Sequence, residues 1–183
     1  MAFWTSNDVE PKRNFRFRVQ MTTGMGGTAI WWAKTVTTPS FDVSEVEHNF
    51  LDNKFYFPGR VSWNEVSLTL VDPISIDAVA LTNKILEKQG YVVTDGDSNI
   101  NYKTMSKAKG KDALGDIIIE ILNAEGDLIE KWTLNQPFLK SAKYGDLDYS
   151  NDDLRTIELT LRYDWAKCET SNSGETGTFF DKA

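Results

Sequence analysis

Residues 51–73 constrain the fold more than any other stretch, because their two halves have opposite characters. The second half alternates apolar and polar side chains with a period of two, which is the pattern of a half-buried β-strand. The first half is aromatic and basic and contains Pro58-Gly59. That pair is typical of a turn or loop, and a central strand does not accommodate a proline. The sequence therefore predicts an apolar loop that leads directly into a core strand. The inward side chains of this strand are Val66, Leu68 and Leu70, and the outward ones are Glu65, Ser67 and Thr69.

The predicted loop over residues 51–60, with the residue before it, carries four large aromatic side chains: Phe50, Phe55, Tyr56 and Phe57. A patch of this size is not left in water without a purpose. Either the loop folds back onto its own domain, or another chain covers it. The choice between these two alternatives decides the function.

Alternation with the same period recurs along most of the chain and predicts a mainly β fold. A glycine turn at residues 24–27 predicts a hairpin between the first two strands, and a turn containing Gly126 predicts another. Strands joined in this way predict two antiparallel sheets packed as a sandwich or half-barrel. The other strand segments are residues 14–21, 30–37, 41–50, 116–122, 128–134, 137–144 and 154–165.

One segment shows a helical period instead. Asp72-Pro73 is typical of a helix start, apolar residues then recur every three or four positions, and Gly90 is typical of a helix end. The sequence therefore predicts one α-helix, over about residues 73–89, that flanks the sheets.

The remaining segments are polar. Residues 91–114 predict a surface loop, residues 1–12 a flexible N-terminal arm, and residues 169–183 a flexible C-terminal tail. We expect a single β domain over residues 1–168.

The composition argues against several classes of function. The net charge of −7 is unlike that of a nucleic-acid binder, which normally has a basic surplus. Cys168 is the only cysteine and His48 the only histidine, so a disulfide, a thiolate zinc site or a histidine-rich site is not predicted. The acidic residues of 146–153 lack the spacing of a calcium loop, which favours a solvated turn. We therefore expect no enzyme, no metal and no cofactor. Neither a signal peptide nor an apolar run of membrane-span length is found, which predicts a protein kept inside a cell.

Three stretches together resemble the tail tube proteins of contractile-tailed bacteriophages. Phe57-Pro58-Gly59-Arg60 followed by WNEVSLTL at 63–70 is similar to the family's "PGR…W-acidic-V-x-L-x-V" segment. GDLDYS at 145–150 and TIELTLRYDW at 156–165 are similar to its C-terminal end, where a short turn leads into a long strand ending in Tyr and Trp. PKRNFRF at 11–17, before the first strand, and Tyr102-Lys103 after the helix also fit. In order, these motifs cover residues from about 11 to 165.

The resemblance implies a structural subunit of a phage tail tube. In that family, two antiparallel sheets with a flanking helix pack at a steep angle, and six subunits join their sheets into a closed β-barrel ring. The rings stack into a helical tube inside a sheath, between a baseplate and a tail terminator. The lumen conducts the genome into the host during contractile ejection, and DNA passes without specific binding. The implied location is the virion tail, assembled in the host cytoplasm.

The resemblance also assigns roles to residues. It places the loop before Trp63 at the contact between stacked rings, with Phe50, Phe55, Tyr56, Phe57 and Arg60 as contact residues. Acidic side chains on the polar strand faces are expected to line the lumen, where their negative charge prevents electrostatic binding of DNA. The candidates for the lumen lining are Glu45, Glu47, Glu65 and Glu158.

Two alternatives stay open. The same architecture serves as the inner tube of a contractile injection or secretion system that carries protein, and a lumen without a continuous acidic lining would favour it. A monomeric β-sandwich that binds sugar or peptide would instead use Trp31, Trp32 or Trp63 as stacking platforms, although core or interface packing is the favoured role of these tryptophans.

Overall fold

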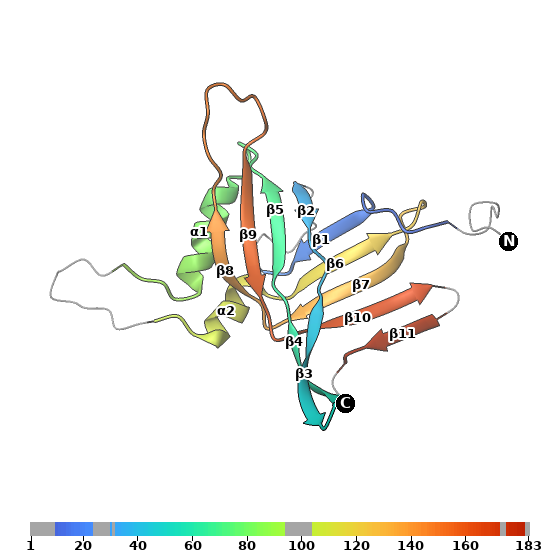
Figure 1. Ribbon diagram of the computed structural model, residues 1–183. Helices are drawn as coiled ribbons and strands as arrows, with labels where there is room; N and C mark the ends of the chain where they lie inside the picture. The colour runs from blue at the N-terminus through green and yellow to red at the C-terminus, as the bar shows by residue number, and fades with distance from the viewer. Residues whose placement is uncertain (1–9, 24–29, 31, 94–103, 173–174, 182–183) are drawn as a thin grey trace.

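The computed structural model describes residues 10–23, 30, 32–93, 104–172 and 175–181. Figure 1 shows two sheets whose strands run in steeply different directions, two helices beside one sheet, and a hairpin that projects from the junction. The five-stranded sheet has the order β1 (Phe17–Met21), β6 (Ile117–Leu122), β7 (Leu128–Asn135), β10 (Trp165–Asn172) and β11 (Glu175–Phe179). The four-stranded sheet has the order β2 (Ala33–Val36), β5 (Val66–Val71), β9 (Thr156–Arg162) and β8 (Phe138–Lys143), and the hairpin consists of β3 (Phe41–Phe50) and β4 (Asn53–Trp63). All these pairings are antiparallel, so the prediction of a mainly β fold with two antiparallel sheets is confirmed.

The core lies between the two sheets. The inward side chains of β5 and β9 are fully buried and lie opposite one another in the pairs Val66–Leu161, Leu68–Leu159 and Leu70–Ile157. The alternation that predicted these two strands is therefore confirmed. Burial of such side chains is the main source of stability in a domain of this size. The five-stranded sheet contributes Val19, Met21, Ile117, Ile119 and Leu134 to the same cluster.

The predicted helix is present as α1 (Ala78–Lys88), but it begins later than Pro73. Asp77 is the N-cap, since its side chain accepts a hydrogen bond from the backbone N of Ala80 at 2.8 Å. Asp72 instead accepts from the backbone N of Ala78 at 3.1 Å. Neither helix of the described residues is long and apolar enough to cross a membrane.

A second helix, α2 (Lys107–Leu114), lies where a surface loop was predicted, so that prediction is wrong for these residues. Ser106 caps its first turn, and Gly115 ends it with a φ of +68°. Gly110 allows the helix to approach β8, because a Cβ there would lie 3.1 Å from the Cβ of Phe138. Both helices contact β8 and each other at one side of the four-stranded sheet (Figure 1).

One of the two predicted hairpins is confirmed, because β6 pairs with β7. The other is wrong. Strand β1 pairs with β6 and strand β2 pairs with β5, so the chain changes sheets between them. The glycine turn at 24–27, Trp31, Tyr102-Lys103 and residues 1–9 of the predicted arm lie outside the described residues.

The long strand predicted over 154–165 is two strands. Strand β9 ends at Arg162, and β10 starts at Trp165 in the other sheet. Strand β10 then continues to Asn172, and β11 pairs with it, with Phe179 opposite Cys168. The polar composition beyond residue 168 predicted a flexible tail, and the structure corrects this by placing strands there. Backbone pairing at a sheet edge requires few apolar side chains, which explains the error.

The first prediction concerns the core. Leu159→Ala leaves a cavity beside Leu68 in the centre of the four-stranded sheet and should lower the free energy of unfolding by about 2–5 kcal/mol. Leu154→Ala removes a side chain that is 72% exposed and should change it by less than about 0.5 kcal/mol. Urea denaturation of the three proteins measures both values. Equal losses would contradict the assignment of Leu159 to the core.

Candidate functional site

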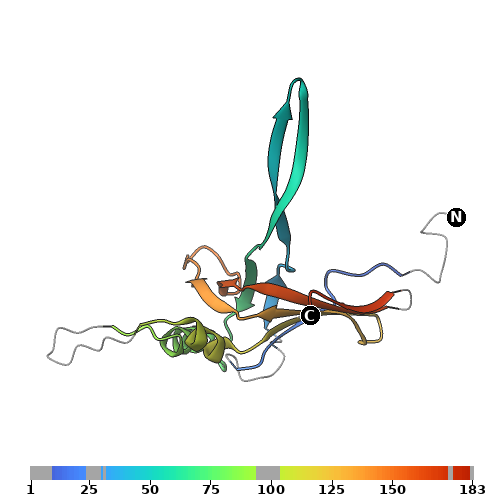
Figure 2. The ribbon, with the colours of Figure 1, turned by 90° about the horizontal axis from the view of Figure 1, so that it is seen from below.

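The candidate site is the β3–β4 hairpin, which stands away from the body of the molecule (Figure 2). Every side chain of β3 is exposed, and so are those of β4 up to the half-buried Trp63. The turn lies at Leu51-Asp52, where Leu51 has a φ of +51°. The predicted loop over 51–60 is therefore wrong as a loop, because most of it is the second strand of this hairpin.

A β-bulge accommodates Pro58-Gly59 within β4. Val43 lies opposite Val61 and Glu45 lies opposite Pro58, so β4 contains one more residue than β3 in this interval. Each strand of a two-stranded hairpin is an edge, and edges and bulges are the places where a sheet tolerates proline. This is why the pair does not interrupt the strand.

Ser44 and Gly59 form the centre of the bulge. The backbone N of Arg60 donates to Ser44 Oγ at 2.8 Å, and the Ser44 hydroxyl donates to the Arg60 carbonyl oxygen at 3.2 Å. A Cβ on Gly59 would lie 2.3 Å from Ser44 Oγ and 2.9 Å from the Ser44 carbonyl oxygen. Only glycine permits this close approach without a shift of the backbone.

The apolar surface changes from one face of the hairpin to the other at the bulge, which keeps the apolar residues of β4 on the same side as those of β3. Residues opposite each other share a face, and the face alternates along each strand. Near the body, one face carries Phe41, Val43, Val61 and Trp63. Beyond the bulge the opposite face is apolar, and we call it the tip face. It consists of Val46, Phe50, Phe55 and Phe57, together with His48.

The tip face is open to solvent. Val46 and Phe50 are each 61% exposed, Phe57 is 56% exposed and Phe55 is 49% exposed. The other side of the tip is polar, where Glu47 Oε1 lies 3.0 Å from Lys54 Nζ. The hairpin tip is therefore amphipathic, and none of the described residues covers its apolar side.

The hairpin joins the body at its root through aromatic packing. The rings of Phe41 and Trp63 lie 5.3 Å apart, and Trp63 lies 6.1 Å from the ring of Tyr163, which follows β9. Tyr163 is buried, and this burial raises the pKa of its phenol to about 12. The root is thus attached to the end of the core strand.

The residues predicted to contact a neighbouring ring divide between the two sides of the hairpin. Phe50, Phe55 and Phe57 belong to the tip face, Tyr56 lies on the polar side, and Arg60 is part of the bulge. The sequence did not reveal Ser44, because only the pairing register shows that it meets Gly59. Trp63 and Tyr163 could have been found from the sequence, because both are aromatic residues at the ends of predicted strands.

The four acidic residues predicted for the lumen divide between the hairpin and the four-stranded sheet. Glu45 and Glu47 lie on the polar side of the hairpin, opposite Pro58 and Tyr56. Glu65 forms ion pairs with Lys140 and, at 3.8 Å, with Arg162. Glu158 Oε2 lies 3.4 Å from Lys143 Nζ. On the four-stranded sheet, basic side chains therefore accompany the acidic ones.

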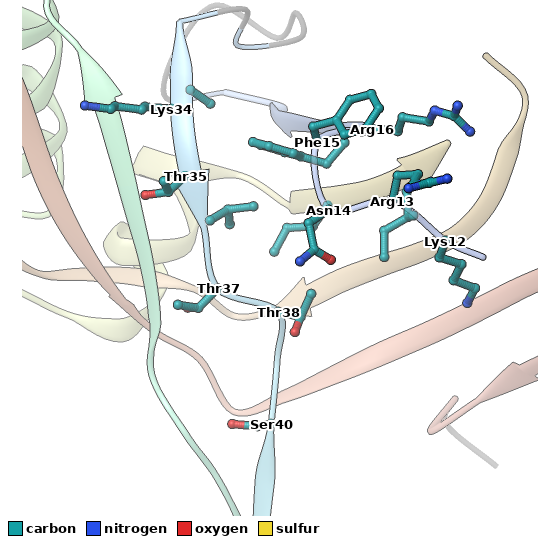
Figure 3. Close-up of a pocket in the computed structure, with 15 residues that line it drawn as sticks. Lys12, Arg13, Asn14, Phe15, Arg16, Lys34, Thr35, Thr37, Thr38 and Ser40 are labelled. Atoms are coloured by element: carbon teal, nitrogen blue, oxygen red, sulfur yellow. The ribbon is translucent and has the colours of Figure 1, made fainter. Parts of the chain in front are cut away.

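A groove of about 990 Å³ lies between β2 and the segment that leads into β1 (Figure 3). Residues 12–17 line one side and residues 33–38 with Ser40 line the other. Two of its four basic side chains are in ion pairs, Lys12 with Glu130 and Arg16 with Glu10. β1 and β2 are the outermost strands of their sheets, and among the described residues β1 is bonded on its outer side by the backbone N of Ile30, which donates to the Val19 carbonyl oxygen at 2.7 Å.

The described residues offer little for catalysis. No group of three or more His, Cys, Asp or Glu side chains in that part of the chain is placed to hold a metal ion. His48 is exposed on the tip face. Cys168 is a buried free thiol, and burial raises its pKa, which disfavours the reactive thiolate. The site is therefore suited to binding through apolar contact.

The fold is shared with components of contractile injection systems. The anti-feeding prophage cap, the AFP tube terminating cap, matches 93% of this chain and 100% of its own with a TM-score of 0.63 and 18% identity. A chain of the PVC sheath–tube complex, from an extracellular contractile injection system in the extended state, matches 91% and 99% with a TM-score of 0.60 and 21% identity. A crystal structure of an Hcp protein matches 88% and 96% with a TM-score of 0.51 and 12% identity.

These likenesses confirm, at the level of the fold, the resemblance to contractile tail tube proteins. No protein-family model matches the sequence. A sequence search of the curated proteins finds no match either.

The second prediction concerns the bulge. Gly59→Ala forces Ser44 and its carbonyl away from β4 and should expose the amides of residues 54–63 to faster hydrogen exchange. The midpoint of global unfolding should stay unchanged, because the hairpin contacts the body only at its root. Hydrogen exchange followed by mass spectrometry measures the effect, with Ser62→Ala as the control on the same strand. Unchanged exchange in Gly59→Ala would contradict the role of Gly59.

The third prediction concerns Tyr163. Its folded-state pKa of about 12 lies above the ordinary value of 10.0, so the folded state holds the phenolic proton more tightly than the unfolded state. The stabilising contribution is complete below pH 10 and is lost as the pH rises towards 12. The free energy of unfolding of the wild type should therefore fall relative to Tyr163→Phe across this interval. If the free energy of unfolding changed with pH in the same way in both proteins, the burial of the Tyr163 phenol would be refuted.

Proposed function

We propose that this protein is the structural subunit of a contractile tail tube, with no enzymatic role, in which six copies form a ring and the rings stack. The tip face of the hairpin carries this proposal. It exposes three phenylalanine rings and a valine on a projection that, in the described part of the chain, contacts the body at its root. A second copy of the chain is the partner that gives every tip face the same cover.

The open sheet edges support ring closure. In the four-stranded sheet, β2 and β8 are the two edges, and neighbouring strands alternate in direction. When β8 of one subunit lies beside β2 of the next, the alternation continues and the sheets form one closed barrel. This pairing also covers the groove beside β2 (Figure 3). Closure removes the free edges that otherwise invite uncontrolled pairing.

Stacking uses the hairpin. It projects from the junction of the two sheets, so a ring of six copies presents six hairpins on one side (Figure 2). Each tip face then buries against the body of a subunit in the next ring. The contact is head-to-tail, so it repeats and yields a tube. Sheath protein around the tube, and a baseplate and terminator at its ends, complete the proposed assembly.

Two candidate cargoes follow from two observations. The motifs shared with phage tail tube proteins support a genome that passes through the lumen without specific binding, in a tail assembled in the host cytoplasm and carried by the virion. The charges of the four-stranded sheet favour the second candidate, an injection or secretion tube that carries protein. Glu65 and Glu158 are each in ion pairs with basic side chains, so this sheet does not present a continuous acidic surface.

The fourth prediction separates the two sides of the hairpin tip. Phe57 and Tyr56 are neighbours of equal exposure, 56% each, and lie on opposite sides. Phe57→Asp places a charge in the apolar contact and should cost about 2 kcal/mol or more per contact, as at a binding hot spot. Tyr56→Asp introduces the same charge on the polar side and should assemble like the wild type.

Electron microscopy of the purified proteins at matched concentration measures tube formation. Circular dichroism and the unfolding midpoint establish that each variant is folded. A folded Phe57→Asp variant that builds full-length tubes would refute the tip face as the stacking contact. A wild type that stays a compact monomer at high concentration would refute the tube itself.

A further inference from the structure

The C-terminal segment reaches the root of the hairpin. Strand β11 pairs with β10 and brings Phe180 beside β3 and β4. The Phe180 ring lies 5.4 Å from Trp63 at an interplanar angle of 87°, and 5.9 Å from Phe41 at 68°. Both arrangements are edge-to-face, the geometry that aromatic pairs prefer. Phe180 thus adds a third element to the aromatic contact between the hairpin and Tyr163.

A second contact fixes the same segment on the other side of Phe180. Asp181 Oδ2 lies 3.0 Å from Lys167 Nζ, and Lys167 also pairs with Glu169 at 3.1 Å. Lys167 belongs to β10, a strand of the five-stranded sheet. This segment is therefore held to the body by Asp181 and to the hairpin by Phe180.

The backbone at Phe180 is unusual. Its φ is +61°, a conformation that a bulky residue rarely adopts. Such a conformation persists where surrounding contacts over-determine it. Here the turn directs the ring back onto Trp63 and Phe41, so the conformation and the aromatic contacts belong together.

We infer that residues 175–181 are a clasp that fixes the orientation of the hairpin on the body, with Phe180 as its positioning residue. The hairpin is otherwise a two-stranded ribbon with exposed side chains, attached only at its root. The angle at the root therefore sets where the tip face lies. The consequence for assembly rests on the proposed function, whereas the orientation itself does not.

The test compares Phe180→Ala with Phe179→Ala in the full chain. The two side chains are neighbours of similar exposure, 49% and 45%, but Phe179 is the residue paired with Cys168 in β11. Nitroxide labels on Asn49→Cys near the hairpin tip and Glu125→Cys in the β6–β7 turn, in a Cys168→Ala background, report the distance between hairpin and body. Pulsed electron paramagnetic resonance measures its distribution at a dilution that keeps the protein monomeric.

We expect the distribution to broaden in Phe180→Ala and to stay narrow in Phe179→Ala and in Phe180→Tyr, which keeps the ring. The unfolding midpoint should be the same in all variants, because Phe180 is half exposed. An unchanged distribution in Phe180→Ala would overturn the clasp. Equal broadening in Phe179→Ala would overturn the role of Phe180 as well, because it would assign the effect to β11 in general.

Assembly provides the second readout. When the root is disordered, each hairpin is less often oriented for stacking. Loss of the two aromatic contacts of Phe180, at the usual strength of such contacts, should therefore slow tube growth by about two- to tenfold. Wild-type growth in the Phe180→Ala variant, despite a broadened distribution, would overturn the assembly role. If the wild type forms no tubes, the proposed function is rejected. The distance measurement then still shows whether Phe180 fixes the orientation of the hairpin.

Discussion

The paired apolar side chains of β5 and β9 form the base from which the β3–β4 hairpin projects. These side chains are fully buried, and β5 begins just after Trp63 while β9 ends just before Tyr163, the two residues of the aromatic pair. The hairpin is therefore anchored to the buried core, against which its own Trp63 also packs. A projection on a rigid base holds its contact surface at a defined place, which an apolar loop of the same composition would not do. Rigidity at the root is thus a requirement for binding at the tip.

The bulge resolves a conflict within the hairpin. At the root, the apolar face must turn toward Tyr163, whereas at the tip it must be available to a partner. Without the bulge, Phe55 and Phe57 would lie on the same side as Val61 and Trp63, opposite to Val46 and Phe50 of β3. The additional residue in β4, made possible by Gly59 and held by Ser44, exchanges the two sides of this strand. Substituting either residue would therefore alter which surface faces the partner without affecting the core.

Periodicity in the sequence predicted the elements that depend on burial. Strands β5 and β9, the β6–β7 hairpin and helix α1 all have a buried face, and their apolar residues follow its period. Elements that depend on backbone geometry or pairing were missed. Alternation continues through Tyr163, although the chain changes sheets there, and the Ser44–Gly59 contact joins residues distant in sequence. Helix α2 was hidden by its lysines and by Gly110, and β11 by its polar composition. The aromatic residues of the site were predicted, but their division between two sides follows from a register that periodicity alone does not give.

The small area of the tip face explains why a clasp is useful. A few apolar side chains give a weak contact between two free subunits, because association costs translational and rotational freedom. In the proposed assembly, a ring that presents six hairpins would make these contacts together, so that each one after the first would be intramolecular. This gain is lost when the sites cannot be engaged simultaneously, since a hairpin at the wrong angle misses its partner. Fixing every hairpin at the same angle therefore strengthens stacking between rings and leaves the isolated subunit only weakly adhesive. The aromatic root, with Phe41, Trp63, Tyr163 and Phe180, is the part of the structure where that angle is determined.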